Sequence, residues 1–134
     1  MDLTNPRYWK LLINQSLLRF FLLRALSEKE IHGYGLQSAL CVISNGLCKP
    51  SQGTLYPSLK EHEQGGYVTG KWIKVKNRKR KVYLLTTSGH KALDVAASIL
   101  EQAMQSISKE KELSPLPLEE ETSKVVPKLP FDET

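Results

Sequence analysis

The spacing of hydrophobic residues in the first part of the chain is helical. In the run LLINQSLLRFFLLRAL, apolar residues recur at steps of three and four, at Leu11, Leu12, Leu18, Leu22 and Leu26. This spacing predicts a buried amphipathic helix over residues 11–26.

A second, shorter helix is predicted from the sequence HGYG at 32–35 onward. Its apolar residues Leu36, Leu40 and Ile43 share one helical face. The turn-forming pair NG at 45–46 then ends it.

The third helix is predicted over residues 52–64. Ser51 can cap its start by accepting a backbone N–H, and the glycines at 65–66 can adopt the left-handed conformation that closes a helix. Pro57 withholds one helical hydrogen-bond donor, so we expect the helix to bend or restart there. The inward face carries Leu55, Leu59 and His62.

The pattern then changes to that of strands. Ile73 and Val75 alternate with lysines, and the run VYLL at 82–85 is rich in strand formers. We expect the sequence NRKR at 77–80 to form the turn. The result is a predicted β-hairpin with a cationic tip. We expect the ring of Trp72 to cover this hairpin, with a base-stacking role as the alternative.

A last helix is predicted after the possible N-caps at 86–88. Its apolar residues follow a heptad pattern, which is short for a lone coiled coil but sufficient to join two copies of the helix. The alternative is that the stripe folds back on its own domain. The predicted dimer interface comprises Leu93, Ala96, Leu100, Ala103 and Ile107.

These elements give the fold class. The order helix, helix, helix, hairpin, helix predicts a mainly α protein with a small β-hairpin, an α+β winged helix-turn-helix with an added C-terminal helix. We expect a DNA-binding domain at 1–86 and a dimerisation helix at 87–109. Residues 110–134 contain four prolines and many acidic residues, and we expect a flexible tail there.

Composition narrows the class of protein. A chain of 134 residues with 40% hydrophobic and 25% charged residues is ordinary for a globular protein. Polar and charged residues interrupt its longest apolar stretch, so we expect neither a membrane partner nor a signal peptide, and a cytoplasmic location. Cys41 and Cys48 lack the spacing of zinc sites, so we expect two reduced cysteines and no metal or other cofactor. The alternative is that the two cysteines form a redox switch or a metal site.

Net charge is uneven along the chain. Residues 1–110 hold 16 Lys and Arg against 8 Asp and Glu, a net +8, while residues 111–134 hold 3 against 6, a net −3, which sums to the +5 of the whole chain. Within the basic part, residues 71–81 carry seven positive charges and no acid. Such a one-sign cluster favours an anionic partner, although a solubilising edge that prevents strand pairing is the alternative.

In a winged helix-turn-helix the third helix enters the major groove of DNA. Gly53 leaves the helix start open to a phosphate, and Tyr56 either contacts the DNA backbone or packs against the wing. The predicted DNA-binding residues are Ser51, Gln52, Gly53, Thr54, Tyr56, Lys60, Lys74, Lys76, Asn77, Arg78, Lys79, Arg80 and Lys81.

A family signature runs through these elements. It comprises His32-Gly33-Tyr34, Gly53-Thr54-Leu55-Tyr56-Pro57-x-Leu59, Glu63-x-x-Gly66, Trp72, and Arg80-Lys81-x-Tyr83-x-Leu85-Thr86-x-x-Gly89-x-x-x-Leu93. With these motifs, roughly residues 11–107 closely resemble PadR-family transcriptional regulators. The resemblance implies a DNA-binding repressor that pairs through its C-terminal helix, as in the smaller PadR subfamily. The layout is also similar to a cyanobacterial circadian period-extending branch, which no residue separates from other short members.

Three positions depart from the family pattern. The family usually has arginine and leucine where this chain has Glu61 and His62, and an aliphatic residue where it has Tyr67. The resemblance therefore implies that a usual phosphate contact is lost at Glu61. We expect a neighbouring group to satisfy the polar ring of His62 in the core.

The predicted function is sequence-specific transcriptional regulation, as a repressor that binds double-stranded DNA at an inverted-repeat operator as a homodimer. The alternatives are a winged-helix protein-interaction module and a sensor of an unknown small-molecule effector. An enzyme is not expected, because no Ser/His/Asp, Cys/His or paired-carboxylate set recurs at usable spacing.

Overall fold

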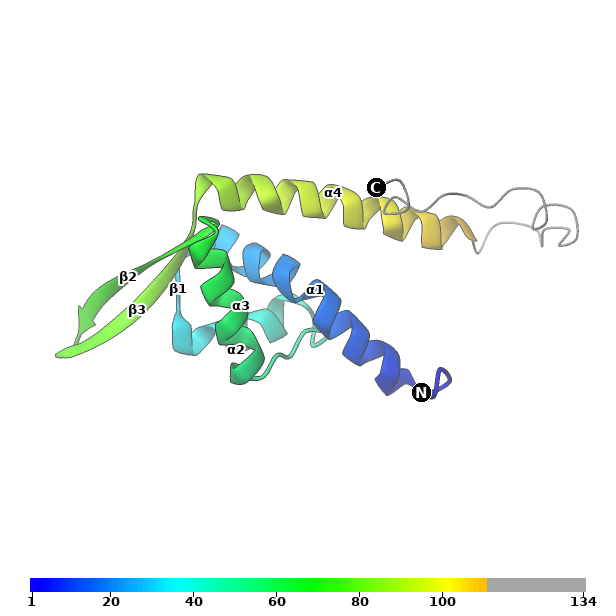
Figure 1. Cartoon of the computed structure of the whole chain (residues 1–134), viewed down its shortest axis with the longest axis horizontal. Coiled ribbons are helices and arrows are strands. Elements are labelled where there is room, and N and C mark those ends of the chain that lie inside the picture. Colours follow the sequence, from blue (N-terminus) through cyan, green and yellow to red (C-terminus); the bar gives the residue numbers. More distant parts are fainter. Residues whose placement is uncertain (111–134) are drawn as a thin grey trace, which may run out of the picture. The chain divides into compact units, whose positions relative to one another are not determined.

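The computed structural model describes residues 1–110, with side chains up to residue 108 (Figure 1). Residues Met1–Glu101 form one compact unit, and residues 102–110 are the last turns of the final helix. The elements are α1 (Pro6–Glu28), β1 (Ile31–His32), α2 (Gly33–Ile43), α3 (Gln52–Gln64), β2 (Val68–Val75), β3 (Arg78–Leu85) and α4 (Thr87–Glu110). This order confirms the predicted fold class, with one strand more than the predicted hairpin.

Helix α1 begins earlier than the apolar pattern indicated. The Asn5 side chain accepts a hydrogen bond from the Arg7 N–H at 3.0 Å, and Pro6 suits the first helical position because its missing N–H has no partner there. The predicted burial of the apolar stripe was wrong for the first half of the helix, where Leu11 is 52% exposed. Its second half supplies the buried residues Leu18, Leu22, Leu23, Ala25 and Leu26.

The core joins all the elements of the compact unit. Leu22 of α1, Leu36 and Leu40 of α2, and Leu55 and Leu59 of α3 are fully or almost fully buried. Val68, Tyr83 and Leu93 add side chains from β2, β3 and α4 to the same cluster. Each such apolar side chain stabilises the fold by about 1.5–3 kcal/mol relative to exposure, so α3 is fixed firmly against its neighbours.

Helix α3 has the predicted bounds and caps. The Thr54 N–H donates to the Ser51 hydroxyl at 3.3 Å, and the left-handed conformation at the C-terminal end is that of Gly66, with φ of 84°. The expected restart at Pro57 was wrong, because α3 continues through it. Proline at this position removes only its own N–H, whose acceptor would have been the Gly53 carbonyl in the first, exposed turn.

The residues at 61 and 62 are accommodated within the fold. The buried His62 ring has its Nδ1 2.6 Å from the Ser58 carbonyl oxygen, which confirms that a neighbour satisfies this polar ring. Glu61 accepts a hydrogen bond from the Arg19 guanidinium at 3.1 Å, which links α3 to α1. Both charged groups of that pair are largely exposed, so the pair contributes little stability.

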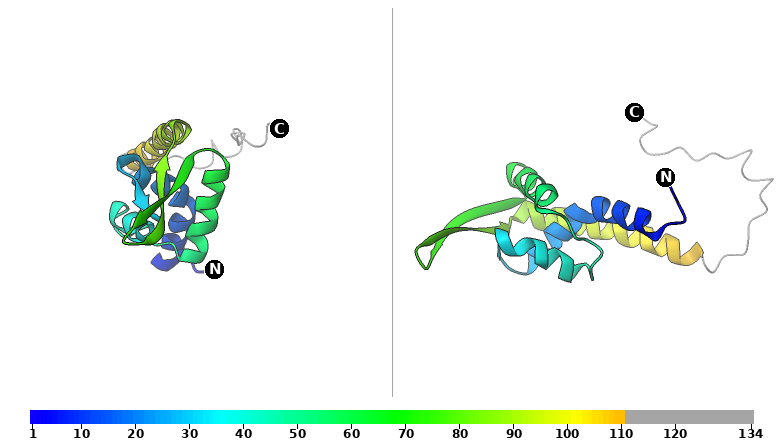
Figure 2. Two further views of the ribbon diagram at one scale, coloured as in Figure 1. Left: turned by 90° about the vertical axis from the view of Figure 1, so that its left-hand side faces the viewer. Right: turned by 90° about the horizontal axis from the view of Figure 1, so that it is seen from below.

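The hairpin turn consists of Lys76 and Asn77. The predicted turn, NRKR at 77–80, was one residue too late at its start, and its residues 78–80 belong to β3 instead. Both turn residues have positive φ, 50° and 63°, which is the two-residue turn whose twist matches that of paired strands. Val75 therefore pairs with Arg78, and β3 begins at Arg78. The far half of this hairpin projects beyond the helices (Figures 1 and 2).

The third strand, β1, was not predicted. Ile31 pairs with Tyr83 and His32 pairs with Val82, so the antiparallel sheet has the order β1-β3-β2. This two-residue strand fixes the start of α2 against the base of the hairpin.

Thr86 connects the hairpin to α4. Its hydroxyl accepts a hydrogen bond from the Gly89 N–H at 3.0 Å, as the predicted N-caps required, and donates one to the Gly66 carbonyl at 2.7 Å. Its own N–H donates to the Tyr67 carbonyl at 3.1 Å. Gly89 is buried, and a Cβ there would approach the Tyr67 carbonyl and lie 2.7 Å from Leu85 Cγ. Only glycine fits at this position because backbone and side-chain atoms fill the space.

Candidate nucleic-acid interface

The start of α3 is open to solvent. Ser51, Gln52, Gly53 and Thr54 are all exposed. A Cβ added to Gly53 would have only the Ser51 hydroxyl within 4 Å, at 3.9 Å, so the protein's own packing does not require glycine there. The backbone N–H groups at this end carry the positive end of the helix dipole, which favours a phosphate.

The polar side chains of this turn differ in their availability. The Ser51 hydroxyl caps the helix and donates to the Thr54 hydroxyl at 3.1 Å. Within the described residues the Gln52 side chain makes no hydrogen bond to protein atoms, so both its donor and its acceptor are available to a base edge.

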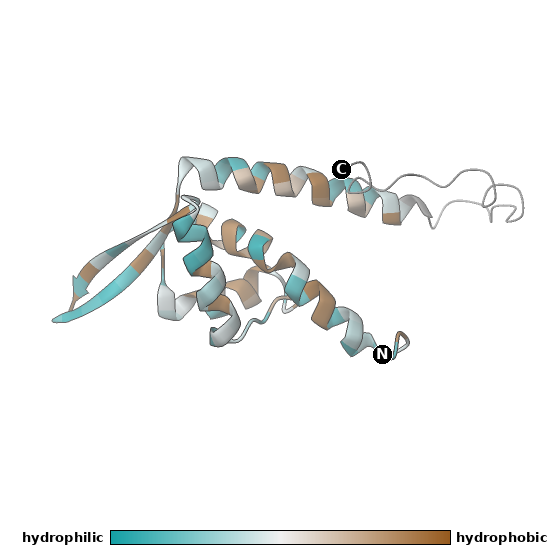
Figure 3. Cartoon of the chain, viewed as in Figure 1, coloured by the Kyte–Doolittle hydropathy of each residue, from teal (hydrophilic) through white to brown (hydrophobic). Residues whose placement is uncertain are grey.

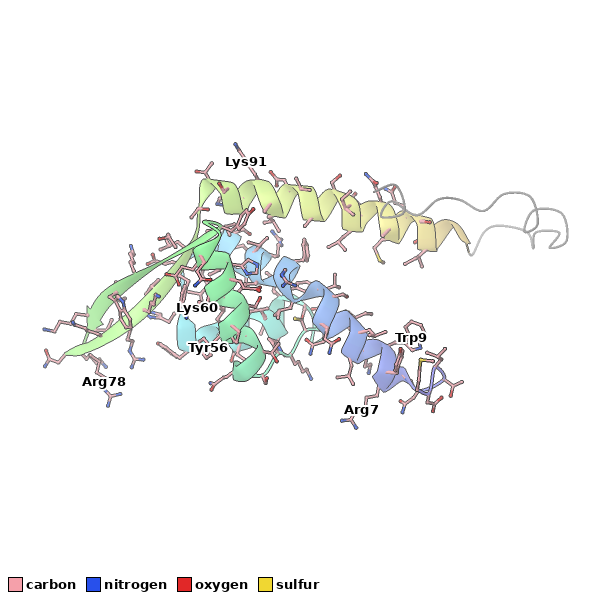
Figure 4. All side chains as sticks on the ribbon, in the orientation of Figure 1. Arg7, Trp9, Tyr56, Lys60, Arg78 and Lys91 are labelled. Carbon is pink, nitrogen blue, oxygen red and sulfur yellow. The ribbon has the colours of Figure 1, made fainter. Side chains whose placement is uncertain are left out.

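Tyr56 faces the start of α2. Its hydroxyl donates to the Gly33 carbonyl oxygen at 3.3 Å, although the residue remains 39% exposed. Since a phenol has one proton, donation to a phosphate would require this bond to break. Lys60, one turn further along α3, is exposed (Figure 4).

The cationic segment of residues 71–81 divides into two groups. Three of its members interact with the body of the protein. Lys71 Nζ lies 3.6 Å from Glu30, Lys81 Nζ lies 3.2 Å from Glu63, and the Arg80 guanidinium lies 4.7 Å from the centroid of the Tyr34 ring. The hydrogen bond to Glu63 raises the pKa of Lys81 above its ordinary value.

The other four cations, which we call the wing tip, are Lys74, Lys76, Arg78 and Lys79. None of them has a carboxylate oxygen within 4.0 Å in the described part of the chain. Lys74 lies directly opposite Lys79 in the strand register, and like charges in that position destabilise a sheet. An anionic partner relieves this repulsion, so the wing tip has the electrostatics of a phosphate-binding surface.

Several of the predicted DNA-binding residues thus have other contacts in this structure, since Ser51 caps α3, Tyr56 donates to Gly33 and Arg80 lies over the Tyr34 ring. Lys81 is paired with Glu63, and its side chain is only 28% exposed. Asn77 forms the turn itself. The residues that divide the cations into two groups are Glu30, Tyr34 and Glu63. Sequence reasoning missed these contacts because all three residues lie outside the two strands of the hairpin.

The expectation that Trp72 covers the hairpin was wrong. Its side chain is 66% exposed, and the nearest charged group over its ring is Lys81 Nζ, 5.9 Å from the centroid. The buried side chains of the hairpin are Val68, Val82 and Tyr83, all in the half nearer the helices, whereas Trp72 lies beyond them along β2.

The apolar stripe of α4 also divides into two groups. Leu93 is 9% exposed and belongs to the core of its own chain, as the fold-back alternative required. Ala96 and Leu100 are half-buried, and Ala103 and Ile107 are exposed. Val95, Ile99 and Met104 are further apolar residues of the helix that are exposed. In Figure 3, hydrophobic and hydrophilic segments alternate along α4.

No described helix is both long enough and apolar enough to cross a membrane. Among the described residues, no group of three or more His, Cys, Asp or Glu side chains is arranged to hold a metal ion.

Comparisons with known proteins agree with this geometry. Residues 22–95 match the model of the transcriptional regulator PadR-like family. The transcriptional regulator Rv3488 of Mycobacterium tuberculosis is 31% identical over 90 residues, which are 67% of this chain and 81% of that protein.

Solved structures show the same fold. The smu.1704 protein of Streptococcus mutans is 27% identical, with a TM-score of 0.64 over 75% of this chain and 92% of that one. The PadR-like regulator BC4206 of Bacillus cereus is 21% identical, with a TM-score of 0.67 over 76% and 98% of the two chains. None of these relatives supports the circadian branch, which stays a prediction. The family match and the mycobacterial relative, together with the open start of α3 and the cationic wing, show that this chain belongs to the PadR-like family of DNA-binding transcriptional regulators.

Proposed function

We propose that the protein is a repressor that binds an inverted-repeat operator as a homodimer, with α3 in the major groove and the wing tip on the backbone. The observation that carries this proposal is the set of four wing-tip cations without a carboxylate partner among the described residues, together with the open α3 start in the same compact unit. As a DNA-binding regulator it acts in the cytoplasm, as a binding protein without a cofactor rather than as an enzyme.

The exposed apolar residues of α4 support a dimer. The Ile107 side chain is 54% exposed and the Ile99 side chain 58% exposed, which is costly for a helix with no partner. Ala96 and Ala103 are small enough to let a second helix approach closely. Leu93, which we predicted to lie at the interface, instead contributes through the core that supports α4.

A two-fold axis through α4 has a consequence for the operator. Two copies present two α3 helices to one side of a duplex, so the two half-sites are inverted relative to each other. The centres of the half-sites are separated by one helical turn of DNA, about 34–36 Å, or by a multiple of that distance. Two wing tips then contact the backbone at the outer edges of the site.

The test combines assembly with DNA selection. In the double variant Leu100→Glu with Ile107→Glu, like charges would enter the α4 seam. We expect sedimentation at micromolar concentration to show a monomer, and binding to genomic fragments selected with the parent to become much weaker. The control is Ser98→Glu with Gln105→Glu, which has the same spacing on the opposite side of the helix.

The proposal fails if the parent sediments as a monomer, or if the Leu100/Ile107 variant stays dimeric with unchanged DNA binding. Repression is measured separately, by transcription in vitro from a promoter that contains the selected fragment. A rise in transcript on addition of the protein would contradict the repressor role.

A further inference from the structure

A second basic surface lies outside α3 and the wing. It is a groove of about 380 Å³ between the first half of α1 and the loop that joins α2 to α3. Its charged and polar lining residues are Arg7, Lys10 and Asn14 from α1, and Asn45 and Lys49 from the loop. We call it the α1 groove.

The loop is fixed onto α1 at this groove. The Lys49 N–H donates to the Asn14 side-chain oxygen at 3.0 Å, and the Cys48 N–H donates to the Ser44 hydroxyl at 2.8 Å. Cys48 itself is fully buried. The backbone of Lys49 is therefore fixed beside the helix that carries Arg7 and Lys10.

The charge of the groove is positive throughout. Arg7, Lys10 and Lys49 are exposed, and no carboxylate lies within 4.0 Å of their charged groups in the part of the chain that the structure describes. The first turn of α1 contains no acidic residue, so its positive dipole end adds to this field. Asp2, the nearest acid along the chain, accepts hydrogen bonds from the Thr4 N–H and hydroxyl at 3.0 and 2.6 Å.

The groove lies next to the end of α3 that meets DNA in the proposed function. Lys49 precedes the cap Ser51 by two residues, which limits the separation of their Cα atoms to about 7 Å. In Figure 4, Arg7 and Arg78 lie at the two ends of the lower edge of the molecule with α3 between them, whereas Lys91 lies at the top.

The length of the groove matches a short run of backbone. Arg7, Lys10 and Asn14 follow each other along one face of α1, and from Arg7 to Asn14 the helix rises about 10 Å. Each strand of B-DNA carries one phosphate per about 3.4 Å of its axis, so this span equals about three phosphates.

We propose that the α1 groove binds the sugar–phosphate backbone of the same duplex, on the side of α3 away from the wing. The inference rests on the proposed contact of α3 and the wing with DNA. It assigns Arg7, Lys10 and Lys49 to phosphate contacts that position the protein without reading sequence.

The test measures the salt dependence of binding to a 40-bp duplex of random sequence. The variant Arg7→Gln with Lys10→Gln should lower the slope of log K against log salt by about 1.8 per protomer, from about 0.9 per phosphate contact. At 0.15 M salt this corresponds to about 5-fold weaker binding per lost contact. Adding Lys49→Gln should lower the slope further by about 0.9.

The matched control is Lys29→Gln with Lys91→Gln, which removes the same charge from two other exposed positions. We expect its slope to stay close to that of the parent. Circular dichroism and the melting temperature of both variants verify that they are folded. Hydroxyl-radical footprints on selected fragments should show loss of protection at one flank of each half-site only for the Arg7/Lys10 variant.

The outcomes separate this inference from the proposed function. An equal fall in slope for both pairs means that net charge alone acts, and overturns the α1 groove as a site. The comparison is with a wing-tip variant, Lys74→Gln with Lys79→Gln. If this wing-tip variant loses slope while the Arg7/Lys10 variant does not, the α1 groove is also overturned, and the contact of α3 and the wing stays intact. If instead the Arg7/Lys10 variant loses slope while the wing-tip variant does not, the α1 groove stands and the proposed use of the wing fails.

Discussion

The like-charged pair at the wing tip should lower stability and increase DNA affinity at the same time. Lys74 and Lys79 lie opposite each other in the strand register and neither has a carboxylate partner in the described residues. Replacing both with glutamine removes one cross-strand repulsion and two potential phosphate contacts. The double variant should therefore melt at a higher temperature and bind DNA more weakly than the parent.

The magnitudes follow from the register and the proposed dimer. Removing an unfavourable cross-strand pair stabilises a sheet by about 0.2–1 kcal/mol, which raises the melting temperature of a domain of this size by about 1–6 °C. A dimer loses four cations, so the salt slope falls by about 3.6. Between 50 and 200 mM salt, the ratio of the parent's affinity to that of the variant should then shrink by about 150-fold.

The assay is fluorescence anisotropy with a labelled duplex over that salt range, beside thermal melts monitored by circular dichroism. The control variant is Lys71→Gln with Lys81→Gln, which removes the same charge but breaks the ion pairs with Glu30 and Glu63. We expect it to melt at or below the parent's temperature and to lose less slope. The separation into wing-tip cations and cations paired with the protein body would be refuted by two results together. These are equal salt slopes for the two variants and a melting temperature of the Lys74/Lys79 variant below that of the parent.

Three further predictions concern the fold. Gly89→Ala should destabilise the protein by about 1–3 kcal/mol in urea unfolding, because the added Cβ has no space there. Gly53→Ala is the control and should not destabilise it. Equal stability of the two variants would contradict the packing described. Because the pKa of Lys81 is raised in the folded state, its ion pair contributes its full stability below pH 10.5, the ordinary pKa of lysine, and loses that stability as the pH rises through the folded-state pKa. The urea concentration at the unfolding midpoint should therefore fall less at alkaline pH for Lys81→Met than for the parent. Burial and the neighbouring Cys41 raise the pKa of the Cys48 thiol, so a thiol reagent at pH 7.5 should modify Cys41 first, as mass spectrometry of digested protein would show.

Local signals in the sequence were sufficient for α3. Its cap at Ser51, its apolar spacing and the closing Gly66 lie within one segment, so the predicted bounds were correct. The start of α1 was missed because the apolar pattern begins at Leu11, while the helix is initiated by Asn5 and Pro6. The first residue of a helix is determined by one or two capping residues, and the spacing of apolar residues does not reveal them.

Pairing between distant segments was not predictable in the same way. The two residues of β1 are too few to show alternation, and they form a strand only because β3 supplies a partner. The same holds for the wing, where Glu30 and Glu63 fix Lys71 and Lys81 from other elements. A count of charges along the sequence identifies the anion-binding segment, but the tertiary contacts decide which charges remain available.

Three of the hydrogen bonds of Thr86 set a mechanical constraint on any dimer formed through α4. One residue links the end of α3, through Gly66 and Tyr67, to the first turn of α4, through Gly89. A direct linkage of this kind couples the orientation of α3 to that of the first turn of α4. In the proposed dimer, inserting about five base pairs between the half-sites would turn one of them to the opposite side of the duplex, and the protein could not follow.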